Sequence, residues 1–102
     1  MASPFTVYVR PDLYEWCETK VSEGRFRSFS DVVDYAMGFY FDSIMRDRVK
    51  GVTKIPRGEA IKKSVRVNQY VMEGLMATGF FDRAEIVDYA LDFYRRWLEN
   101  DG

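Results

Sequence analysis

The chain has 102 residues, of which 47% are hydrophobic and 17% aromatic, and its formal net charge is −1 at pH 7. This length accommodates one hydrophobic core, and the apolar content excludes an intrinsically disordered chain. Histidine is absent and Cys17 is the single cysteine, which excludes a disulfide framework, a zinc site and the commonest general base. We find neither a secretory signal pattern nor an apolar run long enough to span a membrane, so we expect a cytoplasmic protein without a cofactor or metal.

The near-neutral total conceals a segregation of charge along the chain. Residues 46–66 contain eight basic and two acidic side chains, a net charge of +6, so the other residues together carry −7. A basic segment on an acidic body is typical of a protein that meets an anionic partner through one surface. A solvated linker would explain the same charge equally well.

In chain order, the first predicted element is a strand, because Phe5–Val9 alternates apolar and polar side chains. A helix follows, with Pro11 suited to its first turn and Gly24 suited to the left-handed residue that ends it. The apolar stripe of this helix has helical spacing and consists of Leu13, Trp16, Cys17 and Val21. The motif "SFSD" at residues 28–31 has the form of a capping box and predicts the start of a second helix.

The same order of elements returns in the second half of the chain. The stretches "VVDYAMGFY" at 32–40 and "IVDYALDFY" at 86–94 are identical at six of nine positions and lie 54 residues apart. Before the second stretch come a predicted strand, "KSVRV" at 63–67, an N-cap at Asn68, a helix-ending Gly79 and a second capping motif, "DRAE" at 82–85. The two strands are offset by 58 residues.

A single copy cannot fold alone, because a lone strand has no ladder partner and two short helices cannot cover their own apolar faces. We therefore predict that the strands pair antiparallel and that four helices intertwine about a pseudo-two-fold axis. The predicted fold is mostly α, with a small two-stranded antiparallel ribbon. It forms one domain over residues 1–102, with repeats at 4–46 and 62–98 and a basic linker at 47–61.

This order of strand, helix, glycine, capping box and helix resembles the ribbon-helix-helix family, to which Arc and MetJ belong. The segment "VYVRPDLYEWCETKVSEGRFRSFSDVVDYAM" follows the family pattern, and "SVRVNQYVMEGLMATGFFDRAEIVDYAL" follows it with a shorter first helix. Family members are mostly homodimers that lay their ribbon in the major groove. The resemblance implies a tethered pseudo-dimer that binds double-stranded DNA sequence-specifically and acts as a transcriptional regulator, most simply a repressor.

The resemblance assigns base reading to the residues that alternation places on the open face of the ribbon: Thr6, Tyr8, Ser64 and Arg66. It assigns phosphate contacts to the starts of the second helices and the end of the linker: Phe29, Ser30, Lys62, Lys63, Arg83 and Ala84. Arginine can fork onto guanine, which favours Arg66, whereas Tyr8 alternatively only covers the ribbon edge. Because the two open rows differ, we expect an asymmetric DNA site.

Charged residues near these positions are of both signs. Arg25 and Arg27 add positive charge beside the first capping box, whereas Asp31 is interpreted as part of that cap.

Two features of the repeat allow more than one interpretation. Trp16 aligns with Gly74, which indicates either complementary packing between the copies or a helix glycine that only lowers stability. The second helices carry more aromatic residues than one helical stripe normally buries. We expect most of them in the core and a surplus for self-association on DNA or for a protein partner: Tyr35, Phe39, Tyr40, Phe41, Tyr89, Phe93, Tyr94 and Trp97.

An alternative function is a tandem module of the same fold that binds protein instead of DNA, as a scaffold or an antitoxin. An enzyme is not expected, because the sequence has no nucleophile elbow, phosphate loop or metal-ligand spacing. Asp88 and Asp92 are interpreted as a solvated helix face, and Cys17 as a small core residue.

Overall fold

The computed structural model describes residues 2–46, 59–77 and 86–100, which form two strand–helix–helix units in the predicted order. The first unit comprises β1 (Ala2–Val9), α1 (Pro11–Ser22) and α2 (Phe29–Met45). The second comprises β2 (Ile61–Asn68), α3 (Gln69–Ala77) and α4 (Ile86–Asn100). Both strands begin earlier than the predicted starts at Phe5 and Lys63, because the paired residues of the ladder run from Ala2 opposite Asn68 to Val9 opposite Ile61. The predicted Gly79 helix end, the second capping motif and most of the linker lie outside the described residues.

The first helix begins and ends as the sequence predicts. Pro11 occupies the first turn of α1, and Gly24 adopts the left-handed conformation just beyond the helix, with φ of 79°. The amide of Arg25 donates to the carbonyl of Lys20 at 3.1 Å, and the amide of Gly24 donates to that of Val21 at 3.0 Å. This pair of bonds is a Schellman motif, which satisfies carbonyls that the helix end leaves free.

Side chains cap α2 and α3 as the sequence predicts. The hydroxyl of Ser28 accepts a hydrogen bond from the amide of Asp31 at 3.2 Å. The Asp31 carboxylate reaches back to the amide of Arg27 at 3.3 Å, one residue before the cap. Asn68 Oδ1 accepts from the amide of Tyr70 at 2.9 Å and from the next amide of α3 at 3.2 Å. The serine cap and the asparagine cap are both confirmed, whereas the carboxylate of the predicted capping box binds the amide before the cap and not the cap amide itself.

β1 and β2 form a two-stranded antiparallel sheet, as predicted, and Thr6 lies opposite Ser64 in its register. In the sequence alignment of the two copies, the same two residues are equivalent at the offset of 58. A pair that is both equivalent and opposite marks a local two-fold axis, so the ribbon is organised symmetrically about the Thr6–Ser64 pair.

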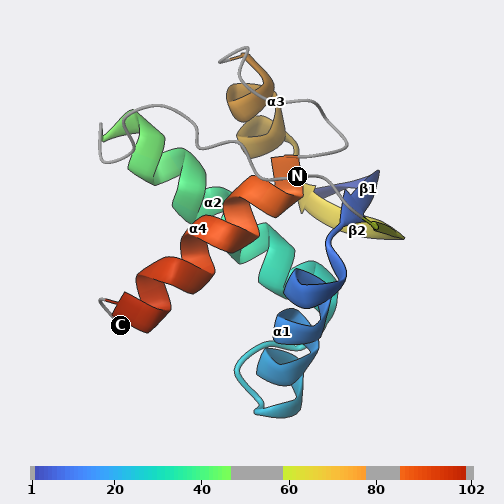
Figure 1. Cartoon of the computed structure of the whole chain (residues 1–102). Helices are drawn as coiled ribbons and strands as arrows, with labels where there is room; N and C mark the ends of the chain where they lie inside the picture. Colours follow the sequence, from blue (N-terminus) through green and yellow to red (C-terminus); the bar gives the residue numbers. More distant parts are fainter. Residues whose placement is uncertain (1, 47–58, 78–85, 101–102) are drawn as a thin grey trace.

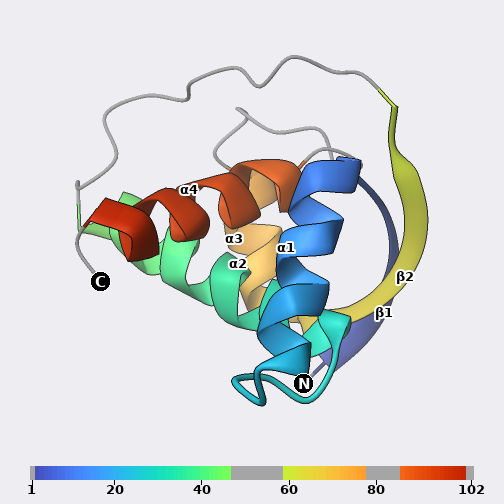
Figure 2. The same ribbon diagram turned by 60° about the horizontal axis from the view of Figure 1, so that its bottom comes forward.

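The helices cover one face of this ribbon. Val7, Val9, Val65 and Val67 point to that face and are fully buried. The second helix of each unit contacts the strand of the other unit, since α2 packs on β2 and α4 on β1. Figure 1 shows α2 and α4 crossing at the centre with α1 and α3 on opposite sides of them, and Figures 1 and 2 place the helices on one side of the ribbon.

Two carboxylates join the units at equivalent places. Asp34 Oδ1 on α2 accepts a hydrogen bond from the amide of Asn68, at the end of β2, at 2.8 Å. Asp88 Oδ1 on α4 accepts one from the amide of Arg10, at the end of β1, at 2.9 Å. These are the two aspartates of the repeated "VDYA" motif, and each binds the strand-to-helix junction of the other unit. The repeat of the aspartate therefore has a structural cause.

The interpretation of Asp88 and Asp92 as a solvated face is wrong. Asp88 is only 6% exposed and Asp92 only 7% exposed. Besides the bond from Arg10 to Asp88, Asp92 forms ion pairs with Arg95 and Arg96 within the same helix. The charges are tolerated in a covered position because amide and guanidinium donors satisfy the carboxylate oxygens.

Gly74 in α3 is a packing position. A Cβ built on Gly74 would lie 2.5 Å from Cε1 and 2.8 Å from Cζ of Phe41, so the ring occupies the space of the missing side chain. The equivalent residue Trp16 packs edge-on against Tyr94, with ring centroids 5.9 Å apart. A large residue on one side of the molecule and a missing side chain on the other agree with complementary packing between the units.

The aromatic residues of α2 and α4 divide between core and surface. Tyr40, Tyr89 and Tyr94 are buried, and Phe39, Phe41 and Phe93 are half-buried. Tyr35 remains 55% exposed and Trp97 37% exposed. Their rings continue the core outward, because Phe39 lies 5.0 Å from Trp97 and Tyr35 lies 5.3 Å from Tyr94 between centroids. The expected surplus beyond the core is therefore present at the α2–α4 crossing.

Buried protic side chains in the core are held neutral. Burial is the main cause that raises the pKa of the Cys17 thiol to about 12 and that of Tyr40 to about 12. Burial likewise raises the pKa of Tyr94. A protonated, enclosed Cys17 agrees with its interpretation as a small core residue.

Within residues 2–46, 59–77 and 86–100, no helix has the combined length and apolar character of a membrane crossing.

Replacing Gly74 by alanine tests the packing against Phe41. Alanine favours a helix over glycine by about 1 kcal/mol, but the added methyl must displace an aromatic ring, and overpacking costs about 1–3 kcal/mol. We expect Gly74→Ala to lower the free energy of unfolding in urea. Gly38→Ala is the matched control, since a Cβ at Gly38 in α2 meets nothing within 4 Å, and it should raise that free energy. In a Phe41→Leu background, Gly74→Ala should no longer destabilise; equal effects in both backgrounds would contradict the proposed contact.

The bond from Asp34 to the end of β2 gives a second prediction. We expect Asp34→Ala to lower the free energy of unfolding by about 2 kcal/mol, because a charge-assisted hydrogen bond between the units is lost. Asp42→Ala removes a carboxylate from the same helix that only forms an exposed i,i+4 ion pair with Arg46, so it should cost less than about 0.5 kcal/mol. Similar losses for the two variants in denaturant titrations would show that the Asp34 bond does not hold the units together.

Candidate nucleic-acid interface

The face of the ribbon turned away from the helices carries two short rows of side chains. On β2, Lys62, Ser64 and Arg66 are all exposed. On β1, Thr6 is exposed and Tyr8 is half-buried. The structure therefore brings all four predicted base-reading residues to one face, and Lys62 continues the row of β2.

Pro4 also belongs to this face, and the sequence-based prediction omitted it. It is exposed and lies directly opposite Arg66 in the register. Extending the strand alternation by one step, from Tyr8 and Thr6 to Pro4, would have found it. The prediction began the strand at Phe5, where the apolar–polar alternation starts.

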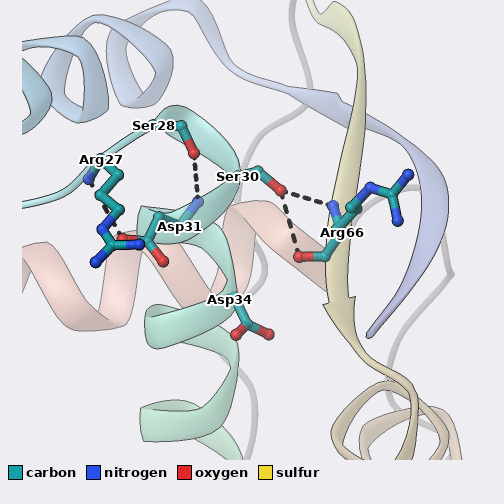
Figure 3. A pocket seen from close by; sticks show the side chains of 6 residues that line it. All are labelled: Arg27, Ser28, Ser30, Asp31, Asp34 and Arg66. Atoms are coloured by element: carbon teal, nitrogen blue, oxygen red, sulfur yellow. Dashed lines mark hydrogen bonds between the residues drawn. The ribbon is translucent and has the colours of Figure 1, made fainter. Parts of the chain in front are cut away.

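Ser30 fixes the backbone from which Arg66 projects. Its hydroxyl accepts a hydrogen bond from the Arg66 amide at 2.6 Å and donates to the Arg66 carbonyl at 3.3 Å. The side chain of Ser30 thus ties the first turn of α2 to the outer edge of β2, while the Arg66 side chain extends away from α2 (Figure 3). Because the Ser30 hydroxyl is engaged in these bonds, the predicted phosphate contact at Ser30 would be made by its backbone amide.

Lys62 and Lys63 both lie within β2, whereas the predicted strand began at Lys63. Consecutive strand residues point to opposite faces, so Lys63 stands on the helix side while Lys62 stands on the outer face. The ammonium of Lys63 lies 4.8 Å from the centre of the Tyr14 ring, a cation–π contact with α1. The predicted phosphate contact of Lys63 would therefore have to come from the flank of the ribbon.

Of the remaining predicted phosphate residues, Phe29 lies at the start of α2. Phe29 is half-buried, and its ring packs on Tyr14 with centroids 5.1 Å apart, so its contribution to an anion would be its amide. Free amides and the helix dipole at a first turn favour a phosphate. Arg83 and Ala84 lie outside the described residues.

A shallow pocket opens beside Arg66, between the first turn of α2 and β2. Figure 3 shows its lining by Arg27, Ser28, Ser30, Asp31, Asp34 and Arg66. The two carboxylates in it already accept hydrogen bonds from backbone amides, Asp31 from Arg27 and Asp34 from Asn68. These carboxylates therefore serve the fold, and the guanidinium groups supply the positive charge of this region.

Basic side chains near the ribbon differ from the other described basic side chains in whether they form ion pairs. Six described basic residues form ion pairs with carboxylates: Arg10, Arg25, Arg46, Arg95, Arg96 and Lys20. The side chains of the other four basic residues form no ion pair with a carboxylate of the described residues: Arg27, Lys62, Lys63 and Arg66. All four lie on β2 or at the pocket beside it, so the uncompensated positive charge of the described residues is concentrated at the ribbon.

The two hydrogen bonds between the Ser30 hydroxyl and the Arg66 backbone give a third prediction. Ser30→Ala should lower the free energy of unfolding by about 1 kcal/mol, because the Arg66 amide and carbonyl lose their partner. Ser22→Ala, which removes a hydroxyl from the exposed end of α1, should change it by less than about 0.5 kcal/mol. Amide hydrogen exchange should quicken at Arg66 in Ser30→Ala alone; unchanged exchange at Arg66 would contradict the role of Ser30.

Comparison of the chain with protein-family models, with curated proteins and with solved structures found no match.

Proposed function

We propose that this protein is a tandem ribbon-helix-helix pseudo-dimer that binds double-stranded DNA sequence-specifically and regulates transcription, as a repressor. The ribbon β1–β2 would enter the major groove, which admits a two-stranded β-ribbon and displays a distinct pattern of donors and acceptors for each base pair. The outer face of the ribbon would meet the base edges, and the start of α2 would meet a phosphate.

The observation that carries this proposal is the placement of unpaired positive charge. The protein as a whole is slightly acidic, with a net charge of −1, yet the described cations without a carboxylate partner gather on and beside β2. Contacts with phosphate depend on such cations, because neutralised phosphates release counterions. An exposed arginine on a ribbon can also fork onto O6 and N7 of guanine.

The support behind the ribbon favours the same function. Asp34 and Asp88 fasten the two strand ends, and Ser30 fastens β2 at Arg66. A reading surface that is held by side chains from behind keeps its base-contacting groups in a fixed register, which lowers the conformational cost of binding.

A protein-binding function has its own supporting observation. Tyr35 and Trp97 are exposed at the α2–α4 crossing, next to half-buried Phe39. Exposed tyrosine and tryptophan side chains are frequent anchors of protein interfaces. This surface lies on other elements than the ribbon face, so the two functions predict different sensitive residues.

The two functions separate in a salt titration. Binding of the purified chain to a fluorescein-labelled duplex of random sequence should weaken steeply as salt rises, because phosphate contacts release counterions. Arg66→Ala should reduce the slope of log affinity against log salt or, on a selected site, cost about 1–3 kcal/mol of base discrimination. Arg46→Ala is the control, since Arg46 is exposed and pairs with Asp42. Absence of duplex binding at low salt, with intact folding by circular dichroism, would contradict the proposed function.

A further inference from the structure

The register divides the outer face of the ribbon into a centre and two ends. Thr6 and Ser64 face each other at the centre. One end consists of Pro4 opposite Arg66, and the other of Tyr8 opposite Lys62. Each end therefore contains one residue from each strand, and the two ends have different chemistry.

Two-fold symmetry about the centre would make the ends identical. At the offset of 58, Pro4 is equivalent to Lys62, and Tyr8 is equivalent to Arg66. A symmetric ribbon would carry a lysine and an arginine at both ends. In this chain one end keeps the arginine and has proline for the lysine, and the other keeps the lysine and has tyrosine for the arginine.

The backbone geometry makes each of these ends a close pair of side chains. Both backbone groups of Arg66 bind Ser30 on the outer edge of β2, so they point away from β1. Residues two apart on a strand share this orientation, which makes all three outward pairs non-hydrogen-bonded ones, with Cα atoms about 4.5 Å apart. Pro4 fits such a place, because the N–H that proline lacks would not have joined the ladder. Two side chains this close act on the same stretch of bases.

We infer that the ribbon reads a DNA site with one fixed polarity. This inference rests on the proposed DNA binding. The Arg66–Pro4 end contacts a guanine-containing step, because arginine forks onto O6 and N7 of guanine. The Tyr8–Lys62 end contacts a step with thymine, whose methyl group an aromatic ring can pack against. The protein therefore binds its site in a single orientation, whereas a symmetric dimer binds a palindrome in two equivalent ones.

The observations behind this inference are local to the outer face. Arg66 is exposed and forms no ion pair with a carboxylate of the described residues, so none of these carboxylates competes with a base for its guanidinium. Tyr8 is half-buried, so part of its ring remains available at the opposite end. Two inward pairs do not contribute to the asymmetry, since both equivalent residues are valine at Val7/Val65 and Val9/Val67.

Selection of bound duplexes from a random library tests this polarity. The wild-type chain should enrich a non-palindromic motif. Arg66→Ala should lose preference, by roughly tenfold or more, at base pairs on one side of the motif centre, and Tyr8→Ala at base pairs on the other side. Both substitutions are at positions that do not belong to the buried core, and thermal unfolding of each variant checks that the fold is retained.

A symmetrised ribbon gives the decisive comparison. The double variant Pro4→Lys/Tyr8→Arg places the same pair of residue types at both ends, so it should enrich a palindrome that repeats the arginine half of the wild-type motif. Thr6→Ser is the matched control, because it makes the central pair symmetric and should leave the motif non-palindromic.

The outcomes separate this inference from the proposed function. If no duplex is enriched by any variant, DNA binding itself is wrong. If the wild-type chain enriches a palindrome, or if Arg66→Ala and Tyr8→Ala alter the same base pairs, DNA binding stands and the polarity is wrong. A motif for Pro4→Lys/Tyr8→Arg that stays non-palindromic would also overturn the polarity, because the ends would then not be set by these residues.

Discussion

The rest of the structure depends on backbone hydrogen bonding between two strands from opposite halves of one chain. A strand on its own leaves its amides and carbonyls unpaired, and here the inward-edge backbone groups of β1 and β2 pair with each other from one end of the ribbon to the other. Asp34 and Asp88 join the units at the strand ends as well, since each carboxylate accepts a hydrogen bond from a backbone amide of the other unit. Neither unit is complete alone, which explains why the chain contains the motif twice.

This arrangement separates two sets of constraints on the same strands. Inward side chains must fit beneath α2 and α4, and the fully buried ones are the same residue at equivalent positions, Val7/Val65 and Val9/Val67. Outward side chains lie outside the buried core and differ between the copies, as at Tyr8 and Arg66. A packed core tolerates little change in volume, whereas the open face is free to diverge. The fold can therefore stay nearly symmetric while its outer face becomes asymmetric.

Charge follows the same division. Carboxylates near the ribbon accept hydrogen bonds from backbone amides, as Asp31 and Asp34 do. A carboxylate used in this way stabilises the fold rather than pairing with a cation. The cations of β2 are left without acidic partners in the described part of the chain. An acidic protein can thus present a positive surface, because the placement of its ion pairs, and not its total charge, sets the local potential.

The sequence by itself determined the elements, the repeat and the need for two copies to share a core. These properties follow from local rules: alternation at Phe5–Val9, the caps at Ser28 and Asn68, and the left-handed Gly24. Local rules failed where the partner comes from a distant segment. The buried carboxylate of Asp88 was taken for a solvated one, because its donor belongs to the other unit.

Only the tertiary structure decided which side chains meet. Phe41 fills the space above Gly74, Lys63 turns toward Tyr14 while Lys62 faces outward, and the register sets Pro4 against Arg66. A shift of one residue in the register would send every strand side chain to the opposite face, and nothing in either strand alone specifies the alignment with its partner. The physical reason is that register is a property of two segments brought together by the folded chain.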